Sequence, residues 1–200
     1  LQQRLDVFYY CLPKIPDDLA EIGPRVIKAF NVRNRFFHIE FFRLSKDIPG
    51  LGKKNEIVGL ETNMRPPGGY TPDLLNFANS VSCYQIWADS MAFDENRQNM
   101  NLPKYYAGVA SRRFDNQYFY SDEDIARTFQ GNLCTMGVYP PILADCMGDK
   151  YYMAKFKTLE ELKVFEAYVA RRVGDPVKEI KTEKKKNSKE AICDTHVDGA

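Results

Sequence analysis

The sequence predicts an α+β protein in which an antiparallel sheet carries helices packed on one side. Two observations lead to this expectation. Strand-like segments are joined by short connections rich in Gly, Pro and Asn, and amphipathic helical segments precede and follow them. The 200 residues are 44% hydrophobic and 13% aromatic, which is enough for one substantial core with a small appendage.

The first elements are a strand, a helix and a hairpin. Residues Leu5–Leu12 alternate weakly and are rich in Phe and Tyr, so they predict a strand. Pro16 opens a helix that extends to Phe30, and we expect it to break or restart at Gly23-Pro24. Two apolar strand-like segments then flank residues Asp47–Asn55, whose composition is typical of the connection between antiparallel neighbours.

The rest of the chain continues in the same α+β pattern. Thr71 can cap a long helix, and Pro72 suits its first turn. We expect this helix to reach about Phe93, with part of its apolar stripe buried. The further predicted elements are strands 104–111, 117–120 and 151–156, a helix from Ser121 to about Thr128, a loop or edge at 139–142, and an amphipathic helix from Thr158 to Val173.

We expect three regions along the chain. Residues 1–93 hold the most informative motif, and residues 94–174 form an appended α+β region. Residues 175–200 are charged and poor in apolar side chains, with three consecutive lysines at their centre, and are predicted to be a disordered tail.

Acidic groups lie within the two apolar strands of the predicted hairpin. Glu40 stands between two pairs of phenylalanines, and Glu61 follows Ile57, Val58 and Leu60. An unpaired carboxylate in such surroundings costs several kcal/mol or changes its protonation state. A bound cation removes this cost.

The spacing of these residues indicates which cation. Residues two apart in a strand share a face, so His38 lies beside Glu40, and Glu61 lies beside Asn63. A hairpin places the two acidic faces side by side, with opposed Cβ atoms roughly 5 Å apart. Carboxylate and amide oxygens are the ligands that Mg²⁺ prefers, together with water and phosphate oxygens. The pattern therefore predicts a magnesium site for a nucleotide, with Mn²⁺ as a substitute.

The order Glu40, Glu61-x-Asn63-x-Arg65 and then Pro-Pro-Gly68-Gly69 resembles the C-terminal part of an ATP-grasp domain, the fold of many carboxylate–amine ligases. The resemblance covers about residues 33–91. It implies that the two glutamates and the asparagine hold the Mg²⁺ of Mg-ATP. It also implies that Arg65, Gly68 and Gly69 lie beside the transferred phosphate and the acyl substrate.

The resemblance implies an ATP-dependent, ADP-forming ligase that activates a small carboxylate as an acyl phosphate for an amine or another nucleophile. The family also needs an upstream half with a glycine-rich loop, a phosphate-binding lysine and an adenine-binding hinge, and residues 1–34 do not contain that loop. We therefore expect an incomplete fragment that is inactive alone and has the upstream half of the same enzyme as a partner.

Alternatives remain at several of these residues. The acidic cluster could be a solvated face of an ordinary sheet, and the chain could be a non-catalytic interaction module that retains an ATP-grasp-like fold. His38 could orient Glu40, touch a phosphate or be a structural histidine. Arg65 could form a surface salt bridge, and Arg112 with Arg113 could bind an acidic substrate or solvate a turn.

Composition excludes several classes of function. A net charge of +1 gives no support for a nucleic-acid or membrane surface, and no apolar run approaches the length of a membrane span. The five cysteines are scattered, and none belongs to a Cys-x-x-Cys pair, so we interpret them as reduced thiols of a cytoplasmic protein. Cys193 and His196 have no second ligand pair for zinc. Homo-oligomerisation stays open.

Overall fold

The computed structural model describes residues 5–176, and within them the α+β prediction is confirmed. The chain forms two compact units. Within the described residues, the first, here called the sheet unit, comprises residues 5–14, 73–81 and 100–176. The second, the hairpin unit, comprises residues 15–72 and 82–99. The predicted tail at 175–200 lies almost wholly outside the described residues.

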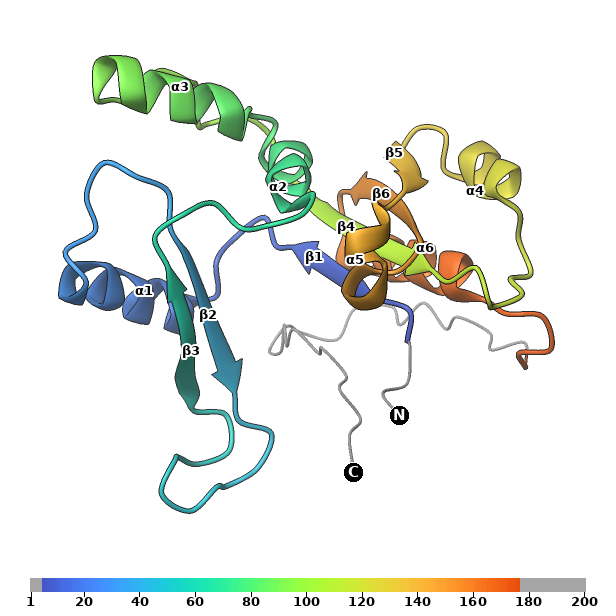
Figure 1. Ribbon diagram of the computed structural model, residues 1–200, viewed down its shortest axis with the longest axis horizontal. Helices are drawn as coiled ribbons and strands as arrows, with labels where there is room; N and C mark the ends of the chain where they lie inside the picture. The colour runs from blue at the N-terminus through green and yellow to red at the C-terminus, as the bar shows by residue number, and fades with distance from the viewer. Residues whose placement is uncertain (1–4, 177–200) are drawn as a thin grey trace. The chain divides into compact units, whose positions relative to one another are not determined.

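The sheet unit contains a four-stranded antiparallel sheet in the order β1-β4-β6-β5 (Figure 1). Its strands are β1 (Phe8–Cys11), β4 (Tyr106–Arg112), β5 (Leu133–Val138) and β6 (Lys150–Phe156). Because β1 pairs with β4 along its whole length, the N-terminal strand belongs with residues beyond 100. The compact units therefore do not follow the boundary at residue 93 that we expected from the sequence.

The core of the sheet unit lies on the face covered by α4 (Asp122–Thr128) and α6 (Leu159–Ala170). Aromatic rings pack against one another there, and Phe129 packs edge to face against Phe165 with ring centroids 5.1 Å apart. These two rings are 9% and 0% exposed. The buried core residues are Ala110, Ile125, Phe129, Tyr152, Ala154, Phe156, Leu162, Phe165 and Val169.

Local sequence explains why α4 and α6 begin where they do. The Ser121 hydroxyl accepts a hydrogen bond from the Asp124 amide at 3.1 Å, and the Asp124 carboxylate accepts one from the Ser121 amide at 3.0 Å. Thr158 and Glu161 form the same reciprocal pair at the start of α6. Such capping boxes satisfy two amides that a helix start leaves without partners.

Three sequence expectations for the sheet unit were wrong. Residues 117–120 form no strand, although Tyr118 makes an isolated bridge to Arg172. Strand β5 was not expected, because Leu-Cys-Thr-Met-Gly-Val shows no clear alternation. Residues 139–142 were expected to be a loop or edge, yet α5 (Pro141–Met147) starts there, with proline in its first turn.

The hairpin unit combines β2 (His38–Arg43) and β3 (Ile57–Asn63) with α1 (Asp17–Ala29) and α3 (Cys83–Phe93). Helix α1 continues through Pro24, so the break expected there does not occur. Arg43 joins β2 to α1 through an ion pair with Asp18 at 2.6 Å. This contact places α1 beside the hairpin, as Figure 1 also shows.

The long helix expected from Thr71 to Phe93 is two helices, α2 (Thr71–Asn79) and α3. Ser80 has φ +57°, a left-handed conformation that ends α2. Ser82 then caps α3 by accepting a hydrogen bond from the Gln85 amide at 3.2 Å. Short polar residues that we expected inside one helix therefore end α2 and begin α3.

Candidate functional site

The hairpin of β2 and β3 forms as the sequence predicts, and its register brings four candidate residues onto one face. Glu40 lies directly opposite Glu61, and His38 lies directly opposite Asn63. Cross-strand partners share a face, and so do residues two apart along one strand. The two carboxylates, the imidazole and the amide therefore occupy one end of one face of this two-stranded sheet.

Hydrogen bonds within this group orient its side chains. The Asn63 Nδ2 donates to Glu61 Oε1 at 2.5 Å. The His38 Nε2 lies 3.4 Å from Glu40 Oε1, and these side chains are 30% and 41% exposed. His38 Nδ1 is buried without a hydrogen-bond partner. Each carboxylate thus has a polar neighbour on its own strand.

A β-bulge lies at the carboxylate pair itself. Glu40 is opposite Glu61, but Phe41 is opposite Gly59, so Leu60 is an extra residue on β3. A bulge bends a strand, increases its twist and redirects neighbouring side chains, and bulges are common next to active sites. The strand alternation gave no signal for it, because the apolar run through Leu60 reads as a regular strand.

Arg65, Gly68 and Gly69 follow β3 but do not contact the carboxylates. The exposed Arg65 guanidinium donates from Nη1 to the Pro66 carbonyl at 2.9 Å. Gly69 has φ +60°, which favours glycine, and a Cβ at Gly68 would meet nothing within 4 Å. The structure thus brings together His38, Glu40, Glu61 and Asn63. It leaves the three downstream candidates in an open turn before α2.

The residues of this face supply two carboxylates and one amide oxygen as possible metal ligands. Within residues 5–176 there is no group of three or more His, Cys, Asp and Glu side chains placed to hold a metal ion. Mg²⁺ usually needs only one or two carboxylates, because water and substrate phosphates complete its six oxygens. The opposed glutamates supply that number, and Asn63 Oδ1 adds a neutral oxygen.

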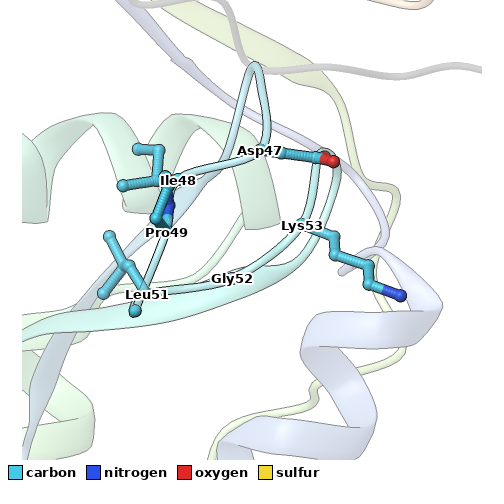
Figure 2. A pocket seen from close by; sticks show the side chains of 7 residues that line it. Asp47, Ile48, Pro49, Leu51, Gly52 and Lys53 are labelled. Atoms are coloured by element: carbon cyan, nitrogen blue, oxygen red, sulfur yellow. The ribbon is translucent and has the colours of Figure 1, made fainter.

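The loop between β2 and β3 encloses a shallow hollow away from these residues. It is lined by seven consecutive residues, Asp47–Lys53. Figure 2 shows the apolar side chains of Ile48, Pro49 and Leu51 on one side, with Asp47 and Lys53 apart from them. Asp47 Oδ1 accepts a hydrogen bond from the Lys54 amide at 2.7 Å, so this carboxylate closes the loop. The hollow gathers no group of reactive side chains.

Arg112 and Arg113, considered above as substrate ligands, are buried in the sheet unit at 4% and 3% exposure. Arg112 Nε donates to the Val169 carbonyl at 2.8 Å. Arg113 Nη2 donates to the Asp145 carbonyl at 3.1 Å, near the end of α5. Both side chains therefore bind main-chain oxygens within the fold.

Two further observations complete the description. None of the helices within residues 5–176 is both long and apolar enough to cross a membrane. Cys193 and His196 lie outside the described residues. Comparisons with protein-family models, with curated proteins and with solved structures found no match.

Proposed function

We propose that the hairpin unit is the Mg-ATP-binding part of an ATP-dependent carboxylate ligase of ATP-grasp type. The observation that carries this proposal is the direct cross-strand pairing of Glu40 with Glu61. Like charges placed directly opposite each other in a sheet are destabilising. A divalent cation between them would attract both carboxylates and remove this repulsion. A metal site would therefore explain why the two glutamates are opposed, whereas an ordinary solvated sheet face would not.

The neighbouring residues extend this site in the direction of a phosphate. Asn63 would contribute its amide oxygen to the ion, and His38 Nε2 would hold Glu40 in place. Arg65 would neutralise charge on the transferring phosphoryl group, because a guanidinium binds phosphate oxygens in bidentate fashion. Gly68 and Gly69 permit close approach of the backbone to the nucleotide or to the acyl group.

The reaction would begin with attack of a substrate carboxylate oxygen on the γ-phosphorus of ATP. The bond from that phosphorus to the β,γ-bridging oxygen breaks, giving ADP and an acyl phosphate. Bound Mg²⁺ would supply charge neutralisation for the phosphate oxygens in this step. Glu40, Glu61 and Asn63 would hold the ion and Arg65 would bind the phosphate oxygens, so that two anions could approach each other. The acyl phosphate then reacts with an amine or another nucleophile and releases inorganic phosphate.

Titration of Mn²⁺ with ATP into the chain, followed by electron paramagnetic resonance, tests this proposal. Because the nucleotide pocket is expected to be incomplete without its upstream half, we expect this chain to bind Mn-ATP weakly and the chain joined to that half to bind it tightly, and Glu40→Gln or Glu61→Gln to weaken binding at least tenfold in both. Glu21→Gln is the matched control, because Glu21 is an exposed carboxylate on α1 of the same unit. Equal affinity in all four proteins would refute the assignment.

Thermal unfolding without metal gives an independent measurement. Each Gln substitution removes the like-charge contact, so we expect the metal-free variants to be as stable as wild type or slightly more stable. Mn-ATP should raise the Tm of wild type and of Glu21→Gln only, because a ligand stabilises the folded state it binds. Binding and stabilisation only in the chain joined to its upstream half would favour the incomplete ligase, and none in either protein would favour the alternative of a non-catalytic interaction module.

A further inference from the structure

Strand β3 contains one more residue than β2 at the point where the two carboxylates meet. Phe41 lies opposite Gly59. Leu60 is then left over, and the next pair is Glu40 with Glu61. Opposed residues share a face of the sheet, and consecutive residues of a strand alternate between faces. The extra residue therefore reverses the alternation of β3 relative to β2 from the bulge onward.

This reversal decides which face of the hairpin carries Glu61. In an unbroken ladder, Leu60 would lie opposite Glu40. Glu61 would then lie opposite Ile39 on the other face, and Asn63 would turn with it. The two glutamates meet as the sequence predicts, but the bulge is what brings them to one face. We call the observed arrangement the bulged register and the unbroken ladder the regular register.

The bulged register carries two costs that the regular register avoids. It places Glu40 directly opposite Glu61, and like charges in that position destabilise a sheet. It also leaves Leu60 outside the ladder, where 53% of this residue is exposed. The regular register would instead place a neutral residue opposite each glutamate. Electrostatic repulsion therefore favours the register in which the cation ligands are apart.

The packing of the hairpin leaves a one-residue shift open. Register is strongly specified where one face of a sheet is buried, but every residue of β2 and β3 is half-buried or exposed. The hydrogen bond from Asn63 to Glu61 runs along β3. The contact of His38 with Glu40 runs along β2, so a shift between the strands would break neither. Both registers therefore keep the polar contacts of this face.

We propose that a one-residue shift of β3 against β2 switches the cation site: the bulged register assembles it, and the regular register takes it apart. A divalent cation held by both Glu40 and Glu61 would bind the bulged register only, so its binding would shift the population toward that register. Without the cation, repulsion between the carboxylates raises the population of the regular register. The switch rests on the proposed function, because it requires these carboxylates to hold the cation of a nucleotide.

Disulfides between opposed positions can report on the two registers. Ile39 lies opposite Thr62 in the bulged register, whereas His38 would lie opposite Thr62 in the regular register. Opposed Cα atoms are roughly 4.5–5.5 Å apart, which a disulfide spans, but side chains on opposite faces point apart and cannot be bridged. Ile39→Cys with Thr62→Cys, the 39–62 pair, therefore traps the bulged register. His38→Cys with Thr62→Cys, the 38–62 pair, traps the regular register.

The rates of crosslinking measure how often each register occurs. We expect both pairs to form a disulfide when the metal-free protein is oxidised, and peptide mass spectrometry distinguishes these bridges from any that involve a native cysteine. Saturating Mn-ATP should slow the 38–62 bridge at least threefold and leave the 39–62 bridge unchanged or faster, because the cation depopulates the regular register. ATP without Mn²⁺ is the control and should change neither rate.

The trapped proteins test whether the register controls binding. In the chain joined to its upstream half, the oxidised 38–62 pair should bind Mn-ATP at least tenfold more weakly than the same protein after reduction, although Glu40, Glu61 and Asn63 are unchanged. Comparing two forms of one protein cancels the loss of His38, and His38→Cys alone controls for the oxidant. The oxidised 39–62 pair should bind as wild type. Circular dichroism confirms that each protein is folded.

The outcomes separate the switch from the cation site itself. If wild type binds Mn-ATP, equal affinity in the oxidised and reduced 38–62 proteins would overturn the switch alone. Failure of the 38–62 pair to crosslink, a crosslinking rate that ignores Mn-ATP, or loss of binding in the oxidised 39–62 pair would overturn it in the same way. If wild type does not bind Mn-ATP even when joined to its upstream half, the proposed function and the switch fall together.

Discussion

The carboxylate of Asp122 provides a quantitative test of the electrostatics in the sheet unit. Its Oδ2 accepts a hydrogen bond from Lys150 Nζ at 2.6 Å, and its Oδ1 accepts one from Tyr152 Oη at 2.6 Å. Arg112 Nη1 lies 3.8 Å from Oδ1. Burial by itself raises the pKa of Asp122, but the Lys150 and Tyr152 hydrogen bonds and the two positive charges outweigh it, so the pKa lies below 3.8.

Asp122→Asn should lower the free energy of unfolding at neutral pH by about 2 kcal/mol. Each hydrogen bond to a charged group contributes about 1.5–3 kcal/mol. The two bonds to Asp122 together contribute less than the sum of these values, because its side chain is 33% exposed and partly screened by solvent. For a chain of this size, that change lowers the Tm by about 4–8 °C. The amide keeps one oxygen that can accept from Lys150, but it carries no negative charge, so the attraction to Lys150 and Arg112 is lost.

The pH dependence has a definite sign. Because the folded-state pKa of Asp122 is depressed, its ionised form stabilises the protein above pH 3.8, and the contribution is lost as the pH falls through the folded pKa. The difference in Tm between wild type and Asp122→Asn should therefore be full at pH 7 and shrink below pH 3.8. Calorimetry from pH 7 downward measures it, with Glu123→Gln as an exposed control on the same helix. An equal difference at every pH would refute the electrostatic explanation.

Three further predictions concern packing and reactivity in the sheet unit. Gly108→Val should destabilise the protein by about 1–3 kcal/mol in urea unfolding, because a Cβ at this position would lie 2.7 Å from Leu162 Cδ1. Phe165→Ala should cost about 3–5 kcal/mol in the same assay, because its side chain is fully buried in the aromatic core. Burial raises the pKa of the Cys134 thiol, so iodoacetamide at pH 8 should label the exposed Cys146 faster than Cys134, as peptide mass spectrometry would show.

Much of the local structure was predictable because short-range physics decides it. The capping residues before α4 and α6 and the turn composition between β2 and β3 identified those elements directly. The pairing of Glu40 with Glu61 also followed, since strand period and hairpin connection constrain which residues share a face. The candidate site is therefore largely a property of one continuous segment.

The sequence alone determined which residues share a face, where the capped helices begin and that acidic groups converge on one hairpin. Only the tertiary structure decided which faces are covered. Periodicity cannot show that α3 buries Asp89 and exposes Trp87, because burial depends on what packs against the helix. Likewise, β1 and β4 pair across roughly a hundred residues of chain, and that contact depends on long-range packing that no local pattern records.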